Sequence, residues 1–131
     1  MKLLRHGEPR PALRPAVFVT LDQINPASTG SNVLVCVLSV AEDSARREGG
    51  HVLEAEVADR TAKATLLLNR KRFPHVRAGD VVALRNLRIK VARGYCLLDI
   101  DPWGRITPET GDPGEPNHAL DVSKVLYELK D

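Results

Sequence analysis

The sequence has few aromatic side chains: two phenylalanines, two tyrosines and one tryptophan among 131 residues. Ligand binding by stacking on many rings is therefore not expected. Hydrophobic runs are also short, and none approaches the roughly 18 to 20 residues that span a bilayer. Residues 1–14 lack the continuous apolar segment of a secretory signal. These absences predict an intracellular protein, nuclear, cytoplasmic or organellar, without membrane association.

Cysteine is scarce as well. Cys36 and Cys96 are the only two, each lies in an apolar run, and no C-x-x-C motif is present. The four histidines are scattered at spacings unlike those of zinc ligands. The pattern predicts two buried thiols in a reducing compartment, with no metal and no cofactor.

Positive charge is concentrated in one segment, although the net charge is only +2. Residues 60–93 hold ten basic side chains and one acidic, a net charge of +9, whereas residues 15–59 and 94–131 carry −5 each. Such a segment usually presents one positive surface and favours a polyanionic partner. The alternative is a solvated basic face with no ligand. The basic residues are Arg60, Lys63, Arg70, Lys71, Arg72, Arg77, Arg85, Arg88, Lys90 and Arg93.

Hydrophobic alternation predicts an all-β domain over residues 15–107. Residues 33–38 are continuously apolar, as in a strand buried on both faces, and the polar residues 41–50 form a long loop. Residues 53–57 and 64–68 then alternate as two further strands. Between them we expect a tight turn, in which Asp59 accepts a hydrogen bond from the backbone two residues on. The first three strands form a meander.

The fourth strand has an inward face that switches parity near residues 85–86. A side-chain period of two cannot switch without an extra residue, so we expect a bulge or sharp bend there. The inward residues are Val82 and Leu84 on one side, and Leu87, Ile89 and Val91 on the other. An irregular connector precedes this strand, with room for a short helical turn, and a fifth strand at 96–100 runs into "DPWGRI". Five such strands fit an OB-fold Greek-key barrel.

Three segments flank the barrel. Residues 1–14 are expected to form a flexible basic arm, and residues 108–118, rich in Pro, Gly and acid, a mobile linker. Residues 119–131 form a docking segment for the barrel, a protein partner or a second copy. That segment is either a short helix or an added strand. In a helix, the inward side chains would be those of Leu120, Val125, Leu126 and Leu129.

The order of motifs resembles the single-stranded nucleic-acid-binding OB folds of the replication-protein-A and SOSS-B type. The resemblance covers about 90 of the 131 residues, from "VFVTLDQINP" through "EVADRTAKATLLL", "VRAGDVVALRN" and "VARGYCLLDID" to "WGRI". It is closest to small plant and protist single-OB proteins, whose fifth strand ends in a similar "D-x-W-G-R-I". The resemblance implies a groove across the second and third strands, flanked by the loops near 41–50 and 92–94.

The chain departs from that family where the groove aromatics are expected, since those positions hold Asn69, Arg88, Ala92 and Asp99. Arginine can substitute in part, because a guanidinium stacks on a base and binds phosphate. Trp103 is expected in the core, closing the barrel. The residues predicted to bind nucleic acid are Asn69, Arg70, Lys71, Arg72, Phe73, Arg88, Lys90, Arg93 and Tyr95.

The function expected is non-catalytic binding of single-stranded nucleic acid, with DNA preferred to RNA as the ligand. A protein-interaction subunit is the main alternative. The tetrad "RHGE" at residues 5–8 resembles the opening of histidine phosphatases, but Pro9 and Pro11 follow at once and no β-α alternation exists to build that site. We interpret it as a chance match and expect no enzyme.

Overall fold

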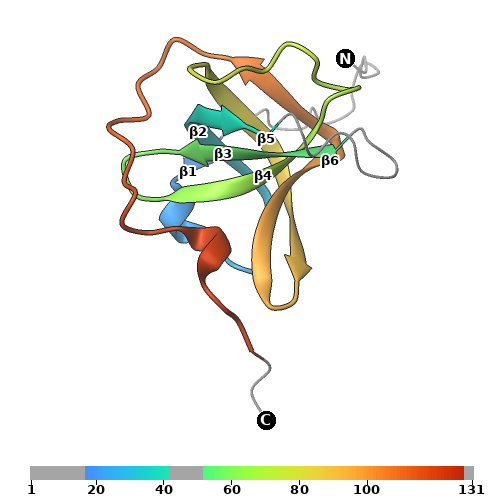
Figure 1. Ribbon diagram of the computed structural model, residues 1–131, viewed down its shortest axis with the longest axis vertical. Helices are drawn as coiled ribbons and strands as arrows, with labels where there is room; N and C mark the ends of the chain where they lie inside the picture. The colour runs from blue at the N-terminus through green and yellow to red at the C-terminus, as the bar shows by residue number, and fades with distance from the viewer. Residues whose placement is uncertain (1–16, 42–51, 129–131) are drawn as a thin grey trace, which may run out of the picture.

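The structure is a computed structural model that describes residues 17–41 and 52–128. Within these ranges the chain forms short and long strands with two 3-10 turns (Figure 1). The strands are β1 (Phe18–Val19), β2 (Thr29–Val40), β3 (Val52–Ala58), β4 (Lys63–Asn69), β5 (Val81–Ala92) and β6 (Tyr95–Pro108), and the turns are η1 (Leu21–Gln23) and η3 (Val122–Lys124). No helix in the described part of the chain is long and apolar enough to cross a membrane.

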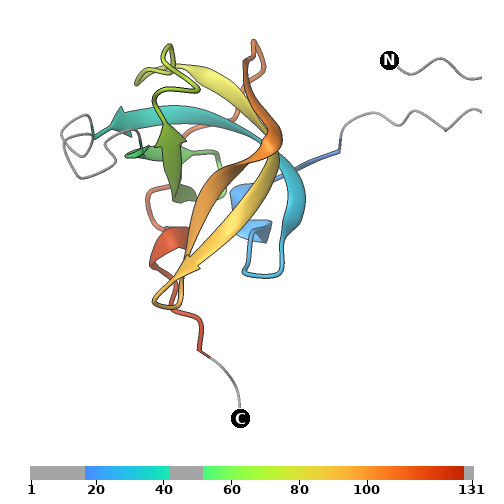
Figure 2. The ribbon, with the colours of Figure 1, turned by 90° about the vertical axis from the view of Figure 1, so that its right-hand side faces the viewer.

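Five of these strands close into a barrel. The sheet order is β1-β2-β3-β4-β6-β5, and an additional pairing of β2 with β5 closes strands β2 to β6 into a ring. The pairing of β4 with β6 is parallel, whereas the other contacts within the barrel are antiparallel. Figure 2 shows β2, β5 and β6 curving around the barrel. The predicted OB-fold barrel is confirmed, and so is the meander of the first three strands, β2 to β4.

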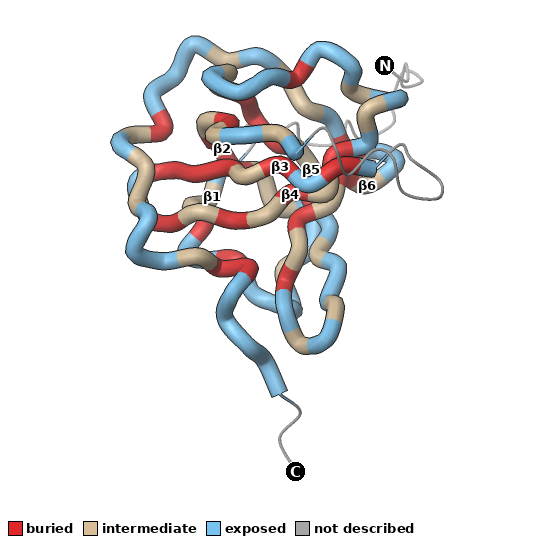
Figure 3. The backbone as a smooth tube through the Cα atoms, viewed as in Figure 1, coloured by how far each residue is buried: buried red, intermediate tan, exposed pale blue. Residues whose placement is uncertain are grey.

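The core follows the predicted alternation. Strands β2, β3, β4 and β6 turn every second side chain inward along most of their length, and these residues are among the buried segments of the tube in Figure 3. They include Val33, Val35 and Val37 from β2, Leu53, Ala55 and Val57 from β3, Ala64, Leu66 and Leu68 from β4, and Cys96, Leu98 and Ile100 from β6. The expectation that residues 33–38 are buried on both faces is wrong, because Leu34, Cys36 and Leu38 are only half-buried.

The predicted irregularity in β5 is a bulge between β5 and β6. Pairing runs from Leu87 opposite Ile100 directly to Arg85 opposite Arg105, so Asn86 alone faces residues 101–104. Asn86 adopts a φ of 57°, the left-handed region that lets a single residue turn the strand. Residues 101–104 are thereby pushed out of the ladder, and we call them the β6 bulge.

The tip of the hairpin between β5 and β6 projects beyond the barrel, next to the C-terminal segment (Figures 1 and 2). Val91 near this tip is 49% exposed, so its predicted inward position is wrong. Leu87 is buried and Ile89 packs against the core, as expected. The parity rule therefore holds for as long as the strand lines the barrel and fails where the hairpin leaves it.

The C-terminal segment is neither the helix nor the full strand that the sequence allowed. Asp121 makes an isolated bridge to Lys63, and η3 follows it. Val122 and Ser123 are the buried residues, and the Ser123 hydroxyl accepts a hydrogen bond from the Thr65 amide. Leu120, Val125 and Leu126 are exposed, so their predicted inward positions are wrong, and Leu129 lies outside the described residues.

Other segments between and beyond the strands can also be placed. The connector 70–80 forms turns without a helix. Residues 108–118, expected as a mobile linker, run along the barrel: the Pro113 carbonyl accepts from the Arg60 amide, and the Asn117 amide donates to the Asp59 carbonyl. The arm 1–14 with its "RHGE" tetrad and the loop 42–51 lie outside the described residues.

Candidate nucleic-acid interface

A groove crosses the outer face of the barrel over β4, β6 and β5. Its centre is a cross-strand row in which Leu67 of β4 lies beside Asp99 of β6, which in turn pairs with Arg88 of β5. Because successive side chains alternate between the faces of a sheet, the inward neighbours Leu66, Leu87 and Leu98 direct this row outward. The groove encloses about 450 Å³ and is lined by Val52, Leu67, Asn69, Arg72, Phe73, Arg88, Asp99, Ile100 and Pro102. We call this surface the outer groove.

Four of the nine predicted binding residues line the outer groove: Asn69, Arg72, Phe73 and Arg88. Three more, Lys90, Arg93 and Tyr95, are exposed on the hairpin that continues from it. Lys71 is exposed in the turn that follows β4. Arg70 points elsewhere, since its Nη1 donates to the carbonyls of Phe73 and Val76 at 3.3 and 2.6 Å.

Two of the arginines in the outer groove are engaged by the protein itself. The Arg88 guanidinium donates to Asp99 Oδ2 through Nε and Nη2, at 3.0 and 2.8 Å. This ion pair cancels the one positive charge that the row would otherwise present. The Arg72 guanidinium instead bonds the backbone of β6. By contrast, the side chains of Lys71, Lys90 and Arg93 make no hydrogen bond or ion pair with any described residue, which leaves their charges open to a ligand.

The basic segment does not form one continuous positive surface. Arg60 and Arg85 line a different groove, together with Phe18, Glu109 and Pro113. Arg85 pairs there with Glu109 at 3.1 Å and lies over the Phe18 ring, 5.3 Å from its centroid. Lys63 lies 3.7 Å from Glu56. Charge near the outer groove is therefore mixed, with its unpaired cations at the two ends.

Sequence reasoning also placed Trp103 wrongly. It is 87% exposed and lies in the β6 bulge, not in the core. The alternation of buried residues 96, 98 and 100 ends at the β6 bulge, where residues 102 and 103 are both exposed. Phe73 is half-buried beneath the Arg72 guanidinium, 4.8 Å from the ring centroid, and Tyr95 is exposed on the hairpin.

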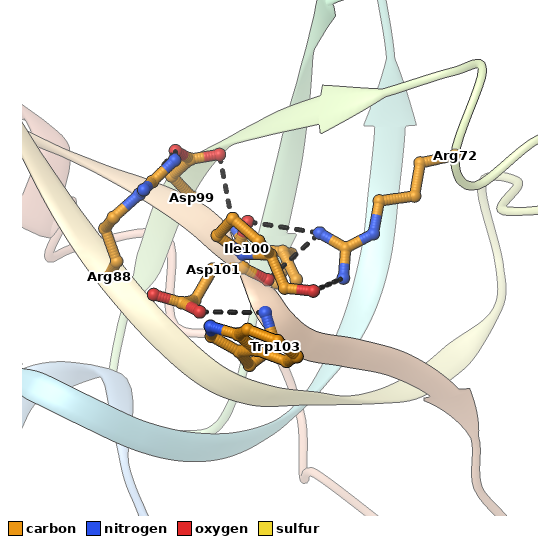
Figure 4. Close-up of polar contacts among 7 residues, drawn as sticks. Arg72, Arg88, Asp99, Ile100, Asp101 and Trp103 are labelled. Atoms are coloured by element: carbon orange, nitrogen blue, oxygen red, sulfur yellow. Dashed lines mark hydrogen bonds and ion pairs between the residues drawn. The ribbon is translucent and has the colours of Figure 1, made fainter.

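Arg72 holds the β6 bulge in shape (Figure 4). Its Nη1 donates to the carbonyls of Ile100 and Asp101 at 3.3 and 3.0 Å, and its Nη2 to those of Pro102 and Gly104 at 3.0 and 2.6 Å. A bulge leaves its carbonyls without partners in the ladder, so one planar guanidinium satisfies four of them. Arg72 is thus a positioning residue for the bulge.

A closed five-stranded barrel with an open groove across its outer face defines an OB-fold domain. Residues 24–108 match the family described as "Single-stranded DNA binding protein Ssb-like, OB fold". The match covers more than half of the chain, and the protein belongs to this family.

The chain is also similar to individual proteins. The chain is 26% identical over 129 residues to the uncharacterized protein At4g28440 of Arabidopsis thaliana, covering 88% of this chain and 84% of the relative. The solution structure of hypothetical protein F20O9.120 from Arabidopsis thaliana superposes with a TM-score of 0.73 at 23% identity, covering 98% of this chain and 97% of that one. Schizosaccharomyces pombe Pot1pC bound to ssDNA superposes with a TM-score of 0.52 at 17% identity, over 72% of this chain and 87% of that one. The two solved structures show the fold.

Proposed function

We propose that this protein binds single-stranded DNA along the outer groove and the β5–β6 hairpin, without catalysis. The observation that carries the proposal is the open groove across β4, β6 and β5 in a chain of the Ssb-like family. Its floor offers the Asn69 amide and the Arg88 guanidinium, and Tyr95 lies further along the hairpin. The Pot1pC neighbour, whose solved structure holds ssDNA, and the resemblance to the replication-protein-A and SOSS-B type support the same function.

The unpaired cations suit a flexible strand. Lys71 lies beyond the end of β4, while Lys90 and Arg93 lie on the hairpin, so basic side chains stand on both sides of the groove. A single strand crossing the groove would meet phosphate contacts at its ends and polar or aromatic contacts between them. Each phosphate contact adds about 0.7 to the dependence of log affinity on log salt. With few unpaired cations and few rings, we expect modest, salt-sensitive and weakly sequence-selective binding.

Fluorescence anisotropy with labelled DNA and RNA strands of one length, measured at several salt concentrations, tests the proposal. The key variant is Lys90→Ala/Arg93→Ala. Its matched control is Arg60→Ala/Arg77→Ala, which removes the same charge away from the outer groove. We expect tighter binding of DNA than of RNA, a loss of about tenfold or more in the key variant with a shallower salt dependence, and near wild-type binding by the control. No binding to either strand at low salt would reject the function.

A second candidate is a protein-interaction subunit that docks a second copy of itself through the C-terminal segment. The specific observation is a cluster of exposed apolar side chains near the hairpin tip: Val91, Val125, Leu126 and Tyr127. The Tyr127 amide donates to the Gly94 carbonyl at 2.8 Å, which holds the segment against the hairpin. Sedimentation of the full chain against Leu126→Asp separates the two: association that the variant abolishes supports docking, and a monomer at all concentrations excludes it.

A further inference from the structure

Trp103 is the most exposed large hydrophobic side chain among the described residues, at 87%. The indole has the largest apolar surface of any side chain, so leaving it in water forfeits much of what burial would contribute to stability. Isolated exposed hydrophobic residues are common on protein surfaces. The exposure of Trp103 alone is therefore weak evidence for a binding role. The structure of the loop beneath it is more informative.

The β6 bulge is closely tied to the fold. Arg72 binds four of the carbonyls around it, and Asp101 Oδ1 accepts a hydrogen bond from the Trp103 amide at 2.8 Å. The residue after Trp103 must be glycine. A Cβ on Gly104 would collide with the carbonyl oxygen of Arg85 and come within 3.0 Å of the carbonyl oxygen of Asn86. Figure 4 shows the indole lying beside Asp101 and away from the Arg72 guanidinium. These contacts fix the backbone that carries the ring, which lowers the entropic cost of ordering the loop on binding.

The bulge also adjoins the outer groove. Pro102, the residue before Trp103, lines that groove together with Arg88 and Asp99. Asp101 and Arg105 lie two residues before and two residues after Trp103, so its neighbours on the strand are charged. A protein-docking anchor is usually surrounded by other contacts that exclude water, whereas a ring next to charged and polar groups suits a nucleotide, which offers both a π-face and a phosphate.

We propose that Trp103 is a stacking platform for one unpaired base of the strand bound in the outer groove. The inference rests on the proposed function and adds a binding residue to it. Arg72 contributes indirectly, because it keeps the platform in place. Stacking on an indole is tolerant of sequence, so this contact raises affinity for any single strand and adds little selectivity.

The chain itself supplies the probe, because Trp103 is its only tryptophan. Intrinsic fluorescence is titrated with an unlabelled oligothymidylate, and anisotropy with the labelled strand is measured in parallel. We expect the emission to be quenched, with a midpoint that matches the anisotropy titration. Trp103→Ala should bind about five- to hundredfold more weakly, and Trp103→Phe should fall between it and the wild type. The control is Phe18→Ala, an exposed ring in the other groove, which should bind as the wild type does.

The outcomes separate the two proposals. Anisotropy that reports binding while the emission stays constant and Trp103→Ala binds normally overturns the stacking role and leaves the outer groove as the site. Absence of binding in both measurements rejects the proposed function, and the stacking role with it. Emission that changes with protein concentration before DNA is added places Trp103 in a protein contact and also overturns the inference. The wild-type titration is decisive even where a variant fails to fold.

Discussion

Arg88 and Asp99 face each other across β5 and β6 and form an ion pair at the centre of the outer groove, with Nη2 2.8 Å from Oδ2. The pair is partly exposed, so it adds at most about 1 kcal/mol to stability. Its larger effect is on the ligand. A phosphate that approaches Arg88 must compete with the Asp99 carboxylate, which restrains the affinity of the groove for any polyanion.

Replacing Asp99 with Asn should therefore tighten binding. The Ile100 amide donates a hydrogen bond to Asp99 Oδ1 at 3.0 Å. Asn at this position keeps an oxygen that can accept this bond, but it removes the competing negative charge. We expect up to about fivefold tighter binding at low salt, since the pair that is lost is worth no more than about 1 kcal/mol. The control is Glu109→Gln, which makes the same charge change beside Arg85 in the other groove. Equal tightening in both variants would show an effect of net charge alone.

Asp59 should be the most sensitive polar residue of the fold. It is 2% exposed, and its carboxylate accepts hydrogen bonds from the amides of Leu21, Thr61 and Ala62 and from the Thr61 hydroxyl. Asp59→Ala leaves these donors without their acceptor. We expect a loss of about 3 kcal/mol or more in the free energy of unfolding, measured by urea denaturation. Exposed Asp112→Ala should cost well under about 1 kcal/mol, and a similar cost for both variants would contradict this account.

Gly104 should tolerate no side chain. An added Cβ would meet the backbone carbonyls of Arg85 and Asn86 in β5 and Ile100 Cγ2. Gly104→Ala should cost about 1 to 3 kcal/mol and shift the emission of Trp103, because the bulge must reshape. Gly111→Ala is the control, since its Cβ would meet only the end of the Leu34 side chain at 3.0 Å. Melting temperatures and emission spectra of the two variants check this.

The two thiols should react slowly at neutral pH. Burial raises the pKa of Cys96, and burial together with the nearby charges of Asp59 and Glu115 raises the pKa of Cys36. Because the native state holds the protons more tightly than the unfolded chain, this contribution to stability is complete below the ordinary thiol pKa and is lost as pH rises through the raised values. Alkylation rates followed by mass spectrometry should show half-buried Cys36 modified before buried Cys96. Rapid modification of both at pH 7 would be inconsistent with these environments.

Much of the barrel could be predicted because its constraints are local and periodic. The parity switch after Leu84 predicted the bulge at Asn86. The turn at Asp59 was predicted because an Asp carboxylate can accept a hydrogen bond from the backbone amide two residues on, here that of Thr61. Both features follow from a period of two and from short-range hydrogen bonds.

Which arginines of the site carry a free charge could not be predicted from the sequence. Whether an arginine is available depends on partners distant in sequence: Arg72 finds its acceptors about 30 residues away in β6, and Arg88 finds Asp99 across a hairpin. A count of charges along the chain contains no such pairing. The position of Trp103 also escaped prediction. We expected it in the core because the "WGRI" segment was expected to close the barrel, whereas the bulge opposite Asn86 leaves residues 102 and 103 both exposed.

Amide chemical-shift mapping tests the central claim most directly. Uniformly labelled protein is titrated with a short oligothymidylate at low salt, and the shifted amides are placed on the structure. The account predicts the largest changes at Leu67, Asp99 and Lys90, together with the indole N–H of Trp103, and little change around Phe18 and residues 109–113 of the other groove. Changes confined to that second groove, or no changes at saturating oligonucleotide, would contradict the claim that this OB barrel binds single-stranded DNA across β4, β6 and β5.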